Sequence, residues 1–277
     1  MTNLFINRTG YRPITLQTVL SPKEVPLHVA FQLFDRLTKD APLKSLSHMQ
    51  DHSLRMLNNL VAIEAALVRW RGDLDLLRLA VVLHDVGVFY SQEHCHGPVS
   101  AEKIRPHLPD LRLPIGKQDR LCSIIRAHDD EAHIDDSPEA NALRILDSLD
   151  AFGEIGVYRF LEIYSRRELS TPNMLKKAVE SLMRRRASLP AGWFKDEDRA
   201  VIHREFRHAY DILRGMEATY SRIEEDNGEM LVLEGLRQIR WDTGRLKELL
   251  FDPKFGQNPF AGKYFRDLVQ SLASSGI

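Results

Sequence analysis

The sequence predicts an all-α protein, because apolar residues recur at helical spacing along most of the chain and no strand pattern interrupts them. Val29, Leu33 and Leu37 lie four residues apart and would share one face of a helix. Residues 76–83 are apolar almost without interruption, as in a helix that is buried on every side. Alternating apolar and polar runs bounded by turns, which would indicate strands, are missing. We therefore expect a bundle of helices.

The first residues of the chain lack this periodicity. Residues 1–20 contain Gly10 and Pro13 and show no helical repeat, so we expect an extended arm that packs on the body. Ser21, Pro22 and Glu24 then form a helix start, with serine as the N-cap, proline in the first turn and glutamate closing a capping box. The helix that follows should end near residue 40.

The remaining helices follow in order from the same signals. We expect them over about 47–71, from Asp73 to Leu83, from Pro98 onward, and over about 117–128 and 139–164. Longer amphipathic helices should occupy about 172–187, 196–225 and 229–250, before a last helix near Phe265. These patterns divide the chain into an arm at 1–20, a helical core at 21–166 and a C-terminal helical extension at 167–277 that packs on the core.

The composition excludes several classes of protein. The 38 basic and 39 acidic side chains among 277 residues give a net charge of −1. Binding along a nucleic-acid backbone needs a basic surplus, so this charge argues against it. Two cysteines cannot form a disulfide framework, so a reducing compartment is expected. No apolar signal core and no run of the roughly 20 apolar residues that cross a membrane occur, so we expect a cytoplasmic protein that does not bind membranes.

Ionisable residues at the end of the most apolar helix are candidate metal ligands. His84 and Asp85 follow the run 76–83, where an ionised carboxylate is costly unless it is paired, hydrogen-bonded or bound to a cation. Gly87 supplies the helix break that allows two adjacent side chains to approach one ion. Asp147 is a further carboxylate among apolar neighbours. Imidazole and carboxylate ligands together suit divalent transition ions such as Mn, Fe, Co, Ni or Zn.

The order of these residues resembles a known signature. His52, the pair His84 and Asp85, and then Asp147 are similar to the H…HD…D pattern of the HD superfamily of metal-dependent phosphohydrolases. The flanking strings DHSLRM, LAVVLHDVGVF and LDSLDAFGEIGVYR match as well, and HGPVSAEKI and RAHDDE resemble two later histidine segments of that family. The resemblance covers about residues 24–166 and implies an HD-type helical bundle with additional C-terminal helices.

The resemblance also implies roles for individual residues. His52, His84, Asp85 and Asp147 would hold one ion, and His96 and His128 would hold a second that Asp85 bridges, so one or two ions are expected. Asp85 would also lie nearest to a metal-activated water that hydrolyses a phosphate ester or anhydride of a nucleotide or similar small metabolite. Asp150 is expected behind a ligand histidine, where it would orient the ring.

The chain departs from the family after the HD pair. Val88 and Phe89 stand where many relatives have a basic residue for phosphate and, nearby, an acid that donates a proton. We therefore expect phosphate contacts from arginines elsewhere and proton transfer from Asp129. The candidate arginines are Arg55, Arg126 and Arg159, and for Arg55 a pairing with Asp51 is an equal alternative.

Several other interpretations remain open at this point. The fold also serves diiron oxygenases and non-catalytic sensors that bind a ligand, and a buried network without metal or a mononuclear centre would leave the same residues in place. His48 is expected to be a surface histidine, and the run 184–186 of three arginines a solvated helix end near the negative pole of the helix dipole. The C-terminal helices could cap the pocket or form a homodimer.

Overall fold

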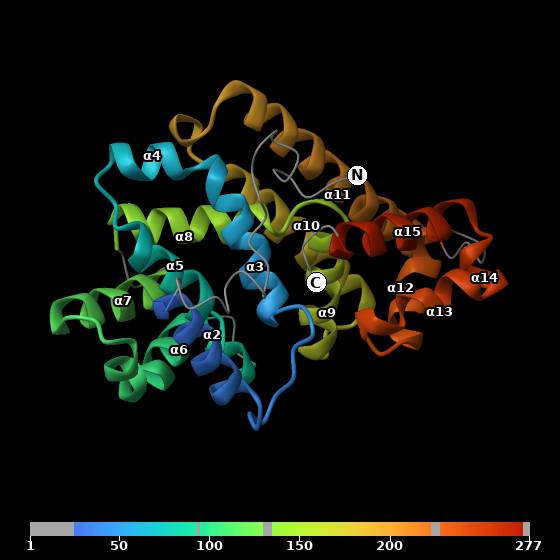
Figure 1. Ribbon diagram of the computed structural model, residues 1–277. Helices are drawn as coiled ribbons and strands as arrows, with labels where there is room; N and C mark the ends of the chain where they lie inside the picture. Colours follow the sequence, from blue (N-terminus) through green and yellow to red (C-terminus); the bar gives the residue numbers. More distant parts are fainter. Residues whose placement is uncertain (1–24, 93–94, 130–134, 223–227, 274–277) are drawn as a thin grey trace.

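The computed structural model describes residues 25–92, 95–129, 135–222 and 228–273. Within these ranges the chain forms fourteen α-helices, several short 3-10 turns and no strand, which confirms the all-α prediction (Figure 1). The arm predicted at 1–20 and the helix start at 21–24 lie outside the described residues. None of the described helices combines the length and the apolar character that a membrane span requires.

The first four helices include one break that the sequence pattern did not predict. Helix α2 spans Val25–Thr38, and the segment expected as one helix over 47–71 is divided into α3, Gln50–Asn59, and α4, Glu64–Arg69. A 3-10 turn at Leu60–Ala62 separates them. Because residues three apart eclipse in a 3-10 turn, Leu60 and Ile63 both face the interior, where they are buried.

Helix α5, Leu74–Leu83, lies at the centre of this part of the molecule. Asp73 caps its start by accepting a hydrogen bond from the Leu76 amide at 3.0 Å. Seven of its ten residues are buried, and it packs against α2, α3, α7 and α8. The helix ends at Leu83, directly before His84 and Asp85. The packing of α5 against these four helices therefore fixes the position of the two residues.

Helices α6, Gly97–Ile104, and α7, Ile115–Ala127, follow and pack on each other. The segment predicted as one helix over 139–164 forms two, α8 at Pro138–Leu149 and α9 at Gly153–Arg166. Gly153 has φ +68°, a conformation that a residue without a Cβ adopts at little cost. The turn before it redirects the chain, so that carboxylates at the end of α8 and an arginine on α9 face the same site.

The C-terminal helices gather against α9. They are α10, Thr171–Ala187; α11, Asp196–Arg222; α12, Gly228–Gln238; α13, Leu246–Phe251; α14, Pro253–Gly256; and α15, Pro259–Ala273. Helix α9 packs against α10, α11 and α15, and one continuous hydrophobic core joins these helices to the first ones. The helix predicted over 229–250 is divided, because Arg240 and Trp241 adopt positive φ between α12 and α13.

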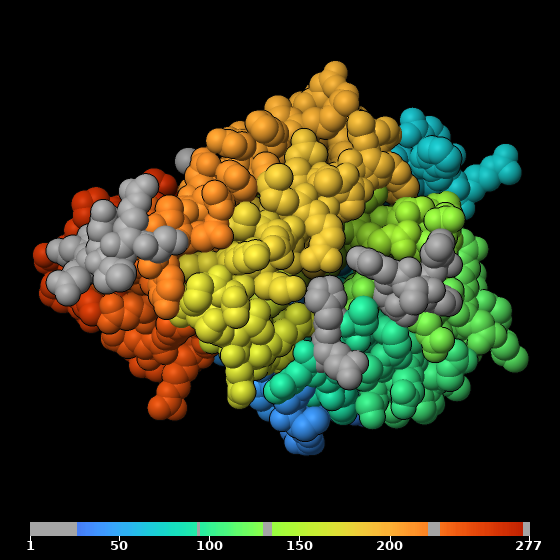
Figure 2. All heavy atoms as spheres, turned by 180° about the vertical axis from the view of Figure 1, so that it is seen from behind, coloured from blue at the N-terminus to red at the C-terminus, as the bar shows by residue number. Residues whose placement is uncertain are grey.

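Helix α10 crosses back over the first half of the molecule. Viewed from behind, the yellow surface of α10 borders the light-green surface of α8 (Figure 2). This placement brings side chains of the C-terminal extension close to the polar residues that end α5, α7 and α8.

Candidate metal centre

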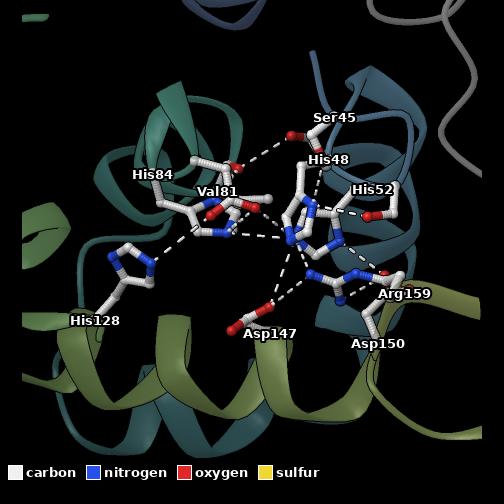
Figure 3. Close-up of polar contacts among 12 residues, drawn as sticks. Ser45, His48, His52, Val81, His84, His128, Asp147, Asp150 and Arg159 are labelled. Atoms are coloured by element: carbon white, nitrogen blue, oxygen red, sulfur yellow. Dashed lines mark hydrogen bonds and ion pairs between the residues drawn. The ribbon is translucent and has the colours of Figure 1, made fainter. Parts of the chain in front are cut away.

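Buried polar side chains converge from the ends of several helices. His52 lies on α3, His84 follows α5, His128 follows α7, and Asp147 lies near the end of α8. All four are less than 9% exposed. Figure 3 shows the rings of His52 and His84 directed toward one another, with Asp147 approaching them from α8. Asp85, also buried, lies among these groups.

One oxygen of Asp85 faces two imidazoles. His52 Nε2 and His84 Nε2 each lie 3.2 Å from Asp85 Oδ2 and are 3.3 Å from one another. Although the distances are short, neither nitrogen has hydrogen-bond geometry to Asp85 Oδ2, a buried atom that accepts no hydrogen bond from the described residues. An orphaned carboxylate oxygen in such a place requires another positive partner.

The other ring nitrogen of each histidine fixes where its proton lies. His84 Nδ1 donates to the Val81 carbonyl at 2.9 Å, and His52 Nδ1 donates to Asp150 Oδ2 at 2.7 Å. Since a carbonyl or carboxylate oxygen can only accept, both Nδ1 atoms carry hydrogen, and in the neutral rings both Nε2 atoms present lone pairs. Two lone pairs and an anionic oxygen therefore meet, an arrangement that a cation stabilises.

The charge of Asp85 acts on the protonation of His84. Burial lowers the pKa of His84, but the charge of neighbouring Asp85 outweighs burial and raises the pKa above its ordinary value. The pKa of Asp85 is held well below its usual range, because His84 and His48 outweigh the effect of burial. The site thus demands a positive charge next to Asp85 Oδ2, either a proton or a metal ion.

A second pair of histidines faces the other oxygen of Asp85. His96 Nε2 lies 2.7 Å from Asp85 Oδ1, and His128 Nε2 lies 3.8 Å from the same oxygen and 3.1 Å from His96 Nε2. His128 Nδ1 donates to the Ile125 carbonyl at 2.7 Å, which again leaves the lone pair on Nε2. Burial lowers the pKa of His128 to about 4, so its ring is neutral and able to bind a metal.

Two groups of side chains can therefore each hold an ion. They are His52, His84 and Asp85, which we call the α5 group, and Asp85, His96 and His128, which we call the α7 group. Asp85 belongs to both groups, with one oxygen directed to each. Imidazole nitrogen and carboxylate oxygen are the donors that divalent transition ions prefer, so the residues present fit such an ion.

Gly87 makes the junction between the groups possible. A Cβ at this position would lie 2.2 Å from the His96 carbonyl oxygen, so only glycine allows the two chain segments to approach. The Gly87 amide donates to Ser100 Oγ on α6 at 2.7 Å. Helix α5 ends at Leu83, before the HD pair, so Gly87 does not break it as expected; this glycine lies in the 3-10 turn Val86–Phe89 and admits the segment that carries His96.

Asp147 lies at the edge of the α5 group. Its Oδ1 atom is 3.6 Å from His52 Nε2 and accepts from Arg159 Nη2 at 3.2 Å, and its Oδ2 atom accepts from Arg185 Nη1 at 2.6 Å. Burial raises the pKa of Asp147, but Arg185 and Arg159 outweigh it and hold the pKa well below the usual range. Asp147 is thus an anion beside the group, and its role as a ligand stays a prediction.

Asp150 lies behind His52 and carries several hydrogen bonds. It accepts from His52 Nδ1, from Arg55 Nε at 2.7 Å and Arg55 Nη2 at 2.9 Å, and from Arg159 Nη1 at 3.0 Å. The carboxylate therefore fixes the orientation of the His52 ring while its own charge is balanced by two guanidinium groups.

Two of the arginines expected to contact phosphate have other positions. Arg55 is buried, pairs with Asp150, and also donates to Asp51 at 3.0 Å, so the alternative pairing with Asp51 is the observed one. Arg126 is exposed on α7. Neither residue lines the cavity described below, and their contact with phosphate stays a prediction. Arg159 does line it.

Asp129 is held as an anion. It accepts from the backbone amides of His96 at 2.7 Å and Gly97 at 2.9 Å, and its Oδ2 atom lies 2.8 Å from His96 Nδ1. Burial raises the pKa of Asp129, but His128, His96 and these hydrogen bonds outweigh it and lower the pKa. These contacts favour a role of Asp129 in orienting His96, and the expected proton transfer from Asp129 stays a prediction.

Two further residues of the site were not identified from the sequence. His48, expected at the surface, is 8% exposed and lines the cavity; its Nδ1 lies 2.8 Å from both Ser45 Oγ and Ser47 Oγ. His48 lies in the turn before α3, and its ring is 5.7 Å from the His52 ring; the spacing of four residues between the two histidines is the signal that could have identified it. Arg185, expected in a solvated helix end, contacts Asp147, and no motif marks it.

A cavity of about 420 Å³ opens beside these groups. Polar and charged residues on its wall include His48, His96, His128, Asp129, Asp147 and Arg159, and α10 contributes Arg185. The cavity therefore gives a small molecule access to the α7 group and to Asp147 from the side that α10 covers.

Comparison with protein families gives one match. The model of the HD domain matches residues 49–152, a range that contains both metal-binding groups and Asp147 but ends before Arg159. Comparison with curated proteins and comparison with solved structures each give no match.

Proposed function

Residues 49–152 form an HD domain, and from this premise we propose that the protein is a metal-dependent phosphohydrolase. The observation that carries the proposal is the position of the buried Asp85, whose two oxygens each face a pair of imidazoles. The substrate we propose is a phosphate ester or anhydride of a nucleotide or a similar small metabolite.

The metal that fits these donors is a divalent transition ion, Mn, Fe, Co, Ni or Zn. The α5 group would hold one ion, with Asp147 as a further ligand, and the α7 group would hold a second. Such an ion, when bound, supplies a water of lowered pKa and positive charge beside the phosphate.

The side chains around the groups prepare them for this chemistry. The Val81 and Ile125 carbonyls and Asp150 hold three Nδ1 protons, so that His84, His128 and His52 direct Nε2 into the two groups. At His52 a metal would replace the contact of Nε2 with Arg159 Nη2, which lies 3.2 Å away. Arg159 and Arg185 place positive charge on either side of Asp147, where a phosphate oxygen entering from the cavity would find guanidinium donors.

Elemental analysis followed by a substrate screen tests the proposal. The purified chain is expected to contain one or more of these metals and, with Mn, Co, Ni or Fe supplied, to release phosphate or a phosphorylated product from a panel of nucleotides and phosphoesters. Asp85→Asn serves as the matched inactive variant. A metal-containing protein that hydrolyses none of the panel but consumes oxygen, or only binds a ligand, would contradict the proposal.

A further inference from the structure

A buried carboxylate outside both metal-binding groups lies close to the cavity. Glu162 on α9 is 4% exposed, and its Oε2 atom accepts hydrogen bonds from Ser47 Oγ at 2.7 Å and Ser45 Oγ at 3.2 Å. Its Oε1 atom accepts from the Leu46 amide at 3.4 Å. Burial raises the pKa of Glu162, against the hydrogen bond from Ser47 and the charge of Arg166, which forms no ion pair with it in the described part of the chain. The two serine hydroxyls are therefore the main contacts that stabilise this carboxylate.

The same two serines determine where the hydrogen of the His48 ring lies. His48 Nδ1 is 2.8 Å from Ser45 Oγ and 2.8 Å from Ser47 Oγ. Each hydroxyl has a single hydrogen, and an ionised carboxylate can only accept, so both hydrogens are directed to Glu162. Each serine oxygen then offers a lone pair to His48 Nδ1, and this nitrogen must carry the hydrogen of the ring.

The other ring nitrogen of His48 is left as an acceptor. Within the described ranges no carboxylate forms an ion pair with this buried ring, and a buried charge without such a partner is costly, so the neutral ring is favoured. A neutral ring with its hydrogen on Nδ1 has a lone pair on Nε2. His48 lines the cavity, and the described residues donate no hydrogen bond to its Nε2 atom. The donor for Nε2 therefore comes from what occupies the cavity.

The cavity wall offers hydrogen-bond donors as well as this acceptor. Arg159 and Arg185 line the cavity, and both contact Asp147. Guanidinium groups donate to phosphate oxygens, whereas a lone pair on His48 Nε2 repels an anionic oxygen and accepts from a hydroxyl group. The wall therefore suits a ligand that has a phosphate group and, apart from it, a hydroxyl group.

We infer that His48 determines specificity by accepting a hydrogen bond from a hydroxyl group of the substrate, and that Glu162, Ser45 and Ser47 are positioning residues that hold its ring in the required tautomer. The inference rests on the proposed function for the phosphate and narrows the substrate to phosphoesters of a nucleoside or sugar with free hydroxyl groups. None of the four residues lies within 49–152, so the match to the HD domain does not include them. A site of this kind discriminates against an analogue without the hydroxyl group, because the buried acceptor is then left unpaired.

Nitrogen-15 NMR of the imidazole rings tests the positioning residues. Two-bond correlation spectra of the full-length chain with Zn²⁺ distinguish the two tautomers of a neutral ring, at about pH 8, where carboxyl groups are ionised. The variant His48→Phe identifies the His48 signals. The wild type is expected to carry hydrogen on Nδ1. Glu162→Gln should shift the ring toward the tautomer with hydrogen on Nε2, because the amide can donate to one serine and leave its hydroxyl hydrogen for Nδ1.

The matched control for this change is Glu154→Gln. Glu154 is also buried on α9 but pairs with His208, so its replacement should leave the His48 tautomer unchanged. If Glu162→Gln does not fold, Glu162→Met, which also frees the hydroxyl hydrogens, takes its place. Hydrogen on Nε2 of His48 in the wild type, an unchanged tautomer in the Glu162 variant, or an equal shift in Glu154→Gln would overturn the inference.

Binding of two nucleotides tests the specificity. Isothermal titration compares AMP with dideoxy-AMP, which lacks both ribose hydroxyl groups, on the wild type, His48→Phe and His203→Phe; His203 is an exposed residue of α11 outside the cavity wall. The wild type and His203→Phe should bind AMP at least about tenfold more tightly than dideoxy-AMP, because dideoxy-AMP leaves the acceptor unpaired, and His48→Phe should bind both alike. No preference for AMP in the wild type, or the same preference in His48→Phe, would overturn the inference. A preference that depends on His48 without hydrolysis of any phosphoester would contradict the proposed function and support the inference. Hydrolysis without such a preference would do the reverse.

Discussion

The ends of α5 and α7 carry the same two residues in the same local structure. His84 and His128 each take the C-cap position of a helix, each donates Nδ1–H to the carbonyl three residues earlier, and each is followed by an aspartate. The two aspartates nevertheless do different things. Asp85 lies between imidazole nitrogens with one oxygen that accepts no hydrogen bond from the described residues, whereas Asp129 accepts from two backbone amides.

This difference shows that a His-Asp pair at the end of a helix does not by itself make the aspartate a metal ligand. The histidine is oriented by its own helix, through a contact that is local in sequence. The role of the aspartate depends on which distant segment meets it. Segment 96–97 offers amide donors to Asp129, while His52, His84 and His96 offer only ring nitrogens to Asp85. A carboxylate that is already satisfied orients a neighbour, and one that is not satisfied attracts a cation.

Replacing the aspartate of α5 should have the largest effect. We expect Asp85→Asn to abolish metal binding and hydrolysis while the helical content stays unchanged, because the amide cannot supply the anion that both groups share. Metal content and circular dichroism measure the two expectations. Asp110→Asn, an exposed carboxylate on the surface, is the control. A metal content in Asp85→Asn equal to that of the wild type would contradict the difference in role between Asp85, after α5, and Asp129, after α7.

Asp150→Asn should damage the α5 group and the fold together. The variant removes one of the two carboxylates that pair with the buried Arg55 and leaves Asp51, which costs up to about 3–5 kcal/mol, and it loosens His52, which lowers metal affinity about 10–100-fold. Urea denaturation and metal titration measure these two effects. Arg126→Met, on an exposed site outside the cavity, should change neither. Stability equal to that of the wild type would show that the Arg55–Asp150 pair does not support His52.

Asp129→Asn should affect only the α7 group. Since Asp129 orients His96, its replacement is expected to lower the affinity of one ion about 10–100-fold and leave the other ion in place. Titration with Co²⁺, followed by its visible absorption, separates the two binding steps. A loss of both ions together would mean that the aspartates at the two helix ends act alike.

Metal binding to the α7 group should depend on pH. Burial lowers the pKa of His96, but Asp129 and Asp85 outweigh it and raise the pKa to about 10. A ring with this raised pKa is protonated below pH 10, and the proton must leave before Nε2 binds a metal. Affinity for this ion should therefore rise about tenfold per pH unit between about pH 6 and 8. Titrations in buffers of different ionisation enthalpy detect the released proton; no release would contradict the assignment.

Arg185→Met should have the smallest effect of these variants. The side chain is 31% exposed and pairs with Asp147 from the cavity side, so its loss should change the stability little. If it contacts phosphate, KM for the best phosphoester should rise up to about tenfold with a smaller change in kcat. Steady-state kinetics measure both constants, with Arg186→Met as control. An unchanged KM would place the phosphate elsewhere in the cavity.

The sequence predicted the parts of the molecule that depend on local chemistry. The apolar run 76–83 predicted the buried helix α5, whereas the end of this helix, at Leu83, comes before Gly87, which lies in the 3-10 helix that follows. The helix break at Gly153 was missed, because apolar periodicity on both sides is continuous and only the backbone conformation requires glycine there. The candidate metal ligands came from an ordered pattern of residues that the fold does bring together.

The contacts between distant segments could not be predicted in the same way. Asp150 and His52 are 98 residues apart, and Arg185 reaches Asp147 from a helix outside the HD domain. Such pairs depend on how α8, α9 and α10 pack, which no local pattern encodes. For the same reason Arg55 looked like a phosphate contact although it closes a buried ion pair.

The number of metal ions bound by four matched chains tests the role of Asp85 most directly. The wild type, His84→Gln, His128→Gln and Asp85→Ala are loaded with Mn²⁺ or Co²⁺, dialysed, and analysed for metal per chain by mass spectrometry. If Asp85 serves both groups, the wild type should retain two ions, each histidine variant one, and Asp85→Ala none. The same metal content in Asp85→Ala as in the wild type would contradict the account.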